Sequence, residues 1–262
     1  TDNSTGASGN TYVAWGWKAN GGSLTTNDAS ATSVGTIDSV YQANTTAGFS
    51  IVTYTGVSAA DTAVAHGLGA VPNLIIVKDR DATKNWTIYH HSMGNDRSIK
   101  LNTTDAQTAS TDHWNNATPT STVFYLGDYS HVNTTDDYIA YCFTEVQGYS
   151  KFGSYTGNGD ADGTFVYTGF KPAYVMLKLY DEDESQSWWI LDNARSPYNV
   201  AEQHLRANYD TSESTGYNIL DFVSNGFKFR DADNAWNSGG YIYAAFAEQP
   251  FVTSGGVPCT AR

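Results

Sequence analysis

An internal repeat limits the possible folds of this 262-residue chain more than any other feature of its sequence. The segment "GFSIVTYTG" returns as "GYSKFGSYTG", with one inserted residue of the kind that a β-bulge absorbs. The following segments of the two copies stay in the same order over about 100 residues. The matching positions include Pro72 and Pro172, Lys78 and Lys178, Trp86 and Trp188, and Asn133 and Asn237. We therefore predict two tandem homologous domains.

Each copy ends on a related segment, "YIAYCFTEV" from Tyr138 and "YIYAAFAEQ" from Tyr241. A third version, "TYVAWGWKA", stands near the start of the chain and contains Trp15 and Trp17. An apolar face of this kind is not stable in water. We therefore expect Trp15 and Trp17 to form an interface with the first full repeat, with a neighbouring subunit or with an upstream domain.

These matches give a domain plan for the whole chain. We predict that residues 1–18 are the closing strand of a preceding repeat and that residues 19–47, rich in Gly, Ser, Thr and Asn, are a linker. The first complete repeat then covers residues 48–147, the second covers residues 148–252, and a tail follows at residues 253–262.

The composition favours strands and turns over helices. Aromatic residues make up 14% of the chain, charged residues only 16%, and Thr, Ser, Asn and Gly fill much of the remainder. Segments such as "NLIIVK" have strand length and are bounded by turn residues. We predict an all-β chain of two antiparallel β-sandwich repeats, jelly-roll or concanavalin-like, with helical turns only near "NVAEQHLRAN" and "SESTGYNIL".

The net charge of −13 argues against a nucleic-acid partner, because phosphate binding needs clustered Lys and Arg and the 14 present are scattered. It also disfavours contact with an anionic membrane surface. The sequence contains no apolar run long enough to span a membrane, so we expect no membrane insertion.

We find no catalytic motif and predict that the protein is not an enzyme and needs no cofactor. His66 lies in the turn-like "HGLG", whereas His90 and His91 are adjacent and would point to opposite faces of a strand. Asp160 and Asp162 in "GNGDADGTF" resemble the start of a calcium loop, but the distant bidentate Glu is missing, so calcium is only an alternative to a solvated turn.

The remaining candidates for recognition are two tryptophans in polar, loop-like stretches, Trp114 in "DHWNNATP" and Trp236 in "DNAWNSGG". Loop tryptophans can stack on sugar rings. We therefore consider both as ligand-binding residues, with local packing as the alternative. Cys142 lies in a predicted strand and is expected in the core, unpaired with Cys259 of the tail.

Six segments from about residue 10 to 252 together resemble a repeat family of bacteriophage tail-fibre-like and other virion structural proteins, especially from marine phages. They are "TYVAWGWKA", "AGFSIVTYTG", "VAHGLGAVPNLIIVK", "YIAYCFTEV", "GYSKFGSYTGNGDADGTFVYTGFKPA" and "GGYIYAAFAEQPF". No catalytic residue set accompanies this family.

The resemblance implies an extracellular virion protein, a tail-fibre or spike adhesin that attaches to a host-surface glycan or protein. We expect it to contact other virion proteins and to form a homo-oligomer. The alternatives are a capsid decoration or head-fibre protein, and a secreted bacterial surface or filament protein with carbohydrate-binding modules. A glycan-degrading enzyme is the minority hypothesis.

Overall fold

The computed structural model of the chain describes residues 8–19, 23–181 and 185–248. Within these residues the chain is nearly all β, with antiparallel sheets and a single short helix, α1 (Ala29–Thr32). The predicted fold class is confirmed at this level. Residues 199–208 and 212–220, which we expected to contain helical turns, instead form short bridges and strands, so that prediction is wrong.

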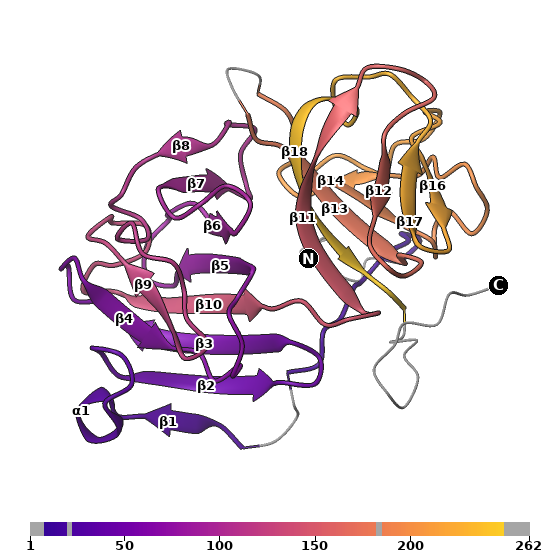
Figure 1. Ribbon diagram of the computed structural model, residues 1–262. Helices are drawn as coiled ribbons and strands as arrows, with labels where there is room; N and C mark the ends of the chain where they lie inside the picture. The colour runs from indigo at the N-terminus through magenta and orange to yellow at the C-terminus, as the bar shows by residue number, and fades with distance from the viewer. Residues whose placement is uncertain (1–7, 20–22, 182–184, 249–262) are drawn as a thin grey trace.

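The first half of the chain forms a large and a small sheet (Figure 1). The large sheet has the order β1-β2-β3-β10-β5-β6-β7-β8, and the small one pairs β4 with β9. These strands are β1 (Thr25–Asn27), β2 (Ser39–Asn44), β3 (Phe49–Thr55), β4 (Thr62–Ala65), β5 (Leu74–Asp79), β6 (Thr87–His90), β7 (Arg97–Lys100), β8 (Thr108–Ala109), β9 (Val123–Leu126) and β10 (Asp137–Phe143).

The second half also forms a large and a small sheet, with the orders β11-β18-β13-β14-β15 and β12-β17-β16. These strands are β11 (Ser150–Asn158), β12 (Phe165–Tyr167), β13 (Tyr174–Leu179), β14 (Trp189–Asp192), β15 (Leu205–Arg206), β16 (Leu220–Val223), β17 (Gly226–Phe229) and β18 (Ser238–Phe246). The order β11-β18-β13-β14-β15 corresponds strand by strand to β3-β10-β5-β6-β7. The inserted residue of the second copy lies in the turn before β11, because β11 pairs with β18 without a bulge over all its residues.

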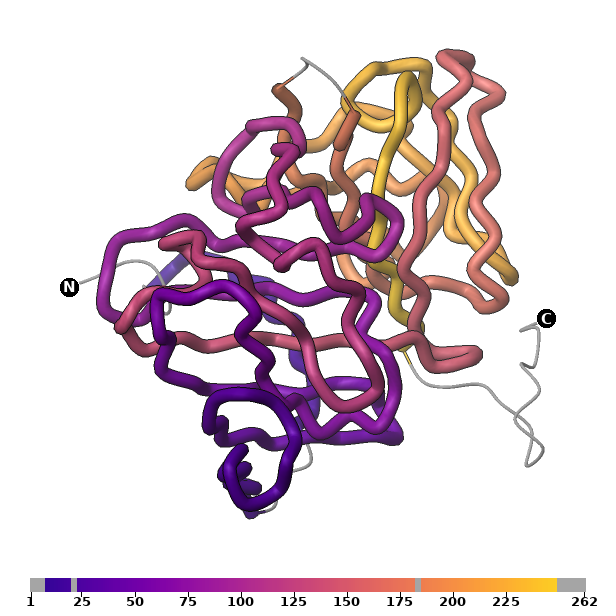
Figure 2. The backbone as a smooth tube through the Cα atoms, turned by 60° about the vertical axis from the view of Figure 1, so that its left-hand side comes forward, coloured from indigo at the N-terminus to yellow at the C-terminus, as the bar shows by residue number. Residues whose placement is uncertain are grey.

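Three apolar clusters hold these sheets together. One lies between the large and small sheets of the first half, and another occupies the same place in the second half. The third lies between the outer faces of the two large sheets, where Phe143 and Ile88 meet Phe152, Met176 and other apolar side chains. We call this third cluster the seam. Figure 2 shows the backbones of the two halves side by side.

The seam explains the continuous apolar run of β5. Leu74 points into the seam, Ile75 into the core of the first half, and the alternation continues along the strand. A strand whose two faces are both buried has no polar face to display. Cys142 lies fully buried in the same core, as predicted, whereas Cys259 lies outside the described residues together with the tail at 253–262.

The two matched asparagines, Asn133 and Asn237, have the same structural role in the two halves. Both are fully buried, and each Nδ2 donates to three oxygens in neighbouring loops and at the end of a strand. Next to each asparagine is a stacked tyrosine pair, Tyr54 on Tyr138 and Tyr155 on Tyr241. The hydroxyls of Tyr54 and Tyr155 donate to the carbonyls of Val132 and Trp236, each immediately before the asparagine.

Residues 19–47 are not a simple linker. Their described part, from residue 23 onward, contains β1, α1 and β2, and β2 pairs with β3 over five residue pairs. The prediction of a linker is therefore wrong for this segment. Its polar composition fits the border of a sheet, where β1 is the edge strand and β2 pairs with β1 on one side and with β3 on the other.

The N-terminal arm, residues 8–19, forms no strand of any sheet. The predicted closing strand is therefore not observed there, and residues 1–7 lie outside the described residues. The arm instead crosses the seam. Trp17 makes edge contacts with Phe143 of the first half and with Tyr174 and Phe246 of the second, at centroid distances of 5.2 to 6.1 Å. Trp17 therefore contacts the first repeat, which was one of the expected interfaces. Trp15 instead contacts Tyr174, Asp192 and Arg195 of the second half, which the sequence did not predict.

Candidate functional site

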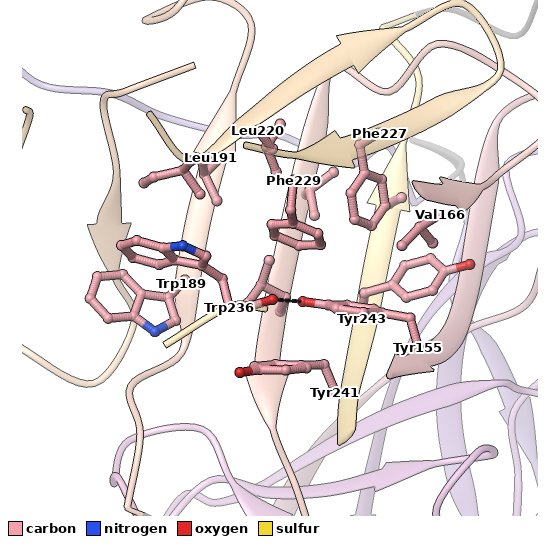
Figure 3. Close-up of a cluster of buried hydrophobic side chains, with 14 of the residues drawn as sticks. Tyr155, Val166, Trp189, Leu191, Leu220, Phe227, Phe229, Trp236, Tyr241 and Tyr243 are labelled. Carbon is pink, nitrogen blue, oxygen red and sulfur yellow. Dashed lines mark hydrogen bonds between the residues drawn. The ribbon is translucent and has the colours of Figure 1, made fainter. Parts of the chain in front are cut away.

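The two tryptophans expected on loop surfaces are buried, so neither is available to stack on a ligand. Trp114 is 1% exposed, packs on Tyr89 and donates from Nε1 to the carbonyl of Arg97. Trp236 is 2% exposed and meets Trp189 edge to face in the second core (Figure 3). Both rings are flanked by polar residues in the sequence, which is typical of surface loops. In the structure, however, both point inward and fill their cores. The prediction of ligand binding at Trp114 and Trp236 is wrong, and local packing describes both.

The carboxylates considered for calcium do not form a metal site. Asp160 accepts the backbone N–H of Asp162, and Asp162 makes an exposed ion pair with Lys228 at 2.8 Å. No group of three His, Cys, Asp or Glu side chains converges anywhere in the described part of the chain. The turn at residues 158–163 is therefore stabilised by its own hydrogen bonds and by a lysine.

The adjacent histidines His90 and His91 have structural partners. The imidazoles of His90 and His91 stack at 5.2 Å instead of pointing apart, because His91 lies in the turn after β6. They interact across the seam with the carbonyls of Tyr243 and Phe152, at 3.2 and 3.1 Å. Burial lowers the pKa of His90 to about 3, which keeps its ring neutral.

Lys178 is the buried group that most resembles an activated amine. Burial lowers the pKa of its ammonium to about 8. Its Nζ donates to the carbonyls of Thr104 and Gln186, and the side chain is fully buried. A substrate has no access to it, so we interpret Lys178 as a tie between the two halves.

The best candidate for a binding site is a groove of about 960 Å³ between the N-terminal arm and the loop after β15. We call it the arm groove. Asn10 and Tyr12 form one wall, and the polar run from Asp210 to Glu213 forms the other. The arm is held in place by Trp15, whose Nε1 donates to Asp192 at 3.3 Å. The seam therefore positions the groove.

Arg195 lies in the arm groove and is fixed by several partners. Its Nε donates to Asp192 at 2.6 Å, and its Nη1 donates to Glu213 at 3.0 Å. Its guanidinium also lies over the ring of Trp15, 5.6 Å from the centroid. An arginine held by two carboxylates and an aromatic ring is preorganised, and its charge is balanced locally. The groove therefore presents no net positive site for a strongly anionic ligand.

The loop beside the groove is held by a second arginine. Arg206 stacks on Tyr209 at 4.8 Å and on Trp189 at 5.5 Å, and its Nη2 donates to the hydroxyl of Thr211 at 3.3 Å. Tyr209 is 50% exposed. In the groove itself, the half-exposed ring of Tyr12, the hydroxyls of Thr211 and Ser212 and the amide of Asn10 can stack on and hydrogen-bond to a neutral polar ligand such as a sugar.

Nothing in the sequence alone pointed to these groups. Tyr12 and Arg195 are 183 positions apart in the chain, and no motif connects them. The segment "NYDTSES" that supplies the other wall has the composition of an ordinary loop. The groove exists only because the arm lies across the seam.

The comparisons with known proteins establish one family relationship. Residues 1–250 match the model of a domain of unknown function, DUF7483. The chain belongs to this family. No curated protein and no solved structure matches it. In the described residues, no helix is long and apolar enough to cross a membrane.

Proposed function

We propose that this protein is a structural component of a bacteriophage virion, and that it serves as a tail-fibre or spike adhesin for host attachment. The observation that carries the proposal is the seam. It joins the two halves face to face through a large apolar cluster and spans them with hydrogen bonds from His90, Trp188 and Lys178. Two sandwiches fixed in this way suit a load-bearing part better than a pair of independently moving binding modules.

We further propose that the two halves are copies of one antiparallel sandwich unit of jelly-roll or concanavalin-like type. The shared strand order and the matched asparagine and tyrosine contacts support this relationship. The resemblance of six sequence segments to phage virion repeats supports the virion location.

The experiment that tests the virion role is to locate the polypeptide on purified phage particles by immunogold labelling and cryo-electron microscopy. We expect labelling at the tail tip or fibres. Labelling over the capsid shell would replace the adhesin with a decoration or head-fibre protein. Absence from intact particles would overturn the virion role and favour a secreted bacterial surface protein.

The arm groove is the part of the surface that we assign to ligand recognition, with a neutral glycan as the ligand class. A glycan array made from host-envelope polysaccharides would test this assignment. Tyr12→Ala should weaken binding by about tenfold, since a stacking ring contributes about 1 to 1.5 kcal/mol. Tyr198→Ala is the matched control, because Tyr198 is 83% exposed and does not line the groove. Equal binding by the wild type and both variants would exclude the groove as the site.

A further inference from the structure

One side of the first half is closed by the segment that precedes it. Strand β2 pairs with the edge of β3, where Val40 lies opposite Thr53. The same segment also covers the edge of β4, because the backbone N–H of Thr36 donates to the carbonyl of Ala63 at 2.8 Å and the hydroxyl of Ser39 donates to that of Ala65 at 3.1 Å. Residues 36–44 therefore provide hydrogen-bond partners for the strand edges of β3 and β4, in both sheets of this half.

The same side of the second half is open. Strand β11 is the counterpart of β3 but ends its sheet, and β12 is the counterpart of β4 but ends the small sheet. The alternation of backbone groups along β11 turns those of Ser154, the counterpart of Thr53, away from β18. Among the described residues neither the N–H nor the carbonyl of Ser154 has a hydrogen-bond partner, and its side chain is exposed.

The side chains of the closed and open sides also differ in how much of them is exposed to solvent. Ala63 and Ala65, under the covering segment, are 6% and 2% exposed. The strand pairings give Phe165 and Tyr167 as their counterparts in β12, and these are 45% and 65% exposed. Two neighbouring aromatic side chains beside an open strand edge make a surface that favours coverage. We call Ser154, Thr156, Phe165 and Tyr167 the open side.

The chemistry of the open side favours a second copy of this chain. From Phe152 to Asn158, β11 contains no charged residue and no proline, so two copies with a net charge of −13 can approach there with little local repulsion. At the start of the strand, the N–H and carbonyl of Phe152 are already capped by Glu145 and His91. This leaves Ser154 as the centre of the unpaired stretch.

An antiparallel edge is complementary to itself. A two-fold axis beside Ser154 lets the N–H of each Ser154 donate to the carbonyl of the other, with both groups unengaged in the single chain. We propose that two copies of this protein associate through the open side, β11 against β11, with Phe165 and Tyr167 packed at the contact. This contact depends on the chain alone and not on its proposed virion role.

The oligomeric state of the full chain tests the inference. Analytical ultracentrifugation across a range of protein concentrations should show a dimer of twice 28.4 kDa, dissociating on dilution. Ser154→Pro removes the unpaired N–H on an edge strand, where proline is tolerated, and Tyr167→Ser removes a contact ring. Each should weaken dimerisation by about tenfold or more. The control Tyr198→Ser should dimerise as the wild type does.

Circular dichroism of each variant checks that it is folded. If Ser154→Pro does not fold, Tyr167→Ser still tests the contact. A monomer at every concentration would overturn the inference. A dimer that neither variant weakens would overturn it as well, because the contact would then lie elsewhere. Hydrogen exchange adds a site-specific reading, since the Ser154 amide should become protected as the protein concentration rises.

Discussion

At the residue scale, the strongest constraints are the buried asparagines. Asn237 is fully buried, and removing its side chain leaves the carbonyls of Asp160 and Asp231 and the backbone N–H of Asn158 without that partner in a part-buried setting. We predict that Asn237→Ala lowers the free energy of unfolding by about 3 kcal/mol, because unsatisfied buried groups carry their full desolvation cost. Urea unfolding followed by tryptophan fluorescence measures this change.

Asn95→Ala is the matched control for that substitution. Asn95 makes a single exposed hydrogen bond to the hydroxyl of Thr118. Its removal should cost less than about 0.5 kcal/mol. If both variants unfold at the same urea concentration, the asparagine contacts do not stabilise the loops in the way we describe.

The two buried tryptophans show why a site can be misjudged from sequence. Trp114 and Trp236 stand among Asn, Asp and Gly, which correctly indicate turns. The local pattern says nothing about a single ring that leaves the turn and enters the core. By contrast, Asn133 and Asn237 were found by matching the two copies, since a duplicated buried contact preserves its residue in both.

At the scale of elements, the strands within the two complete repeats were predictable from the sequence. The strands that precede the first repeat were not. Pro72 and Pro172, which match in the two copies, precede the equivalent strands β5 and β13. Residues 39–44 were missed because their sequence has no alternating apolar pattern, and their pairing with β1 and β3 depends on tertiary contacts. The arm was misjudged for the opposite reason. Its pattern suits a closing strand, but β10 and β18 already occupy that place in the two large sheets, and the rings of the arm pack on the seam instead.

The arm also yields a prediction at this scale. Trp17→Ala should lower the free energy of unfolding by about 2 kcal/mol, since Trp17 is half-buried and contacts rings from both halves. Thermal unfolding should show the loss as one cooperative transition at lower temperature. Tyr198→Ala, which removes an exposed ring, should leave the transition unchanged. A wild-type transition in Trp17→Ala would mean that the arm does not stabilise the seam.

At the scale of the whole molecule, the seam packs the two halves together. Because the seam contains a buried neutral histidine, we expect the stability of the protein to fall in acid. His90 is neutral in the folded protein because burial lowers its pKa from 6.5 to about 3. The unfolded chain therefore binds a proton first as pH falls. Stability from this group is complete above about pH 6.5 and is lost at about 1.4 kcal/mol per pH unit between 6.5 and 3.

His90→Gln isolates that effect, because the glutamine amide can still donate toward the Tyr243 carbonyl and does not titrate. Burial also lowers the pKa of His66 and of His113 to about 4, so the variant should keep part of the acid sensitivity. The free energy of unfolding should therefore fall less steeply in the variant than in the wild type between pH 6 and pH 4, by about 1.4 kcal/mol per unit. Urea titrations at several pH values measure both slopes. Parallel curves would show that His90 takes up its proton without leaving the seam, and that the union of the two halves is not held by a neutral imidazole.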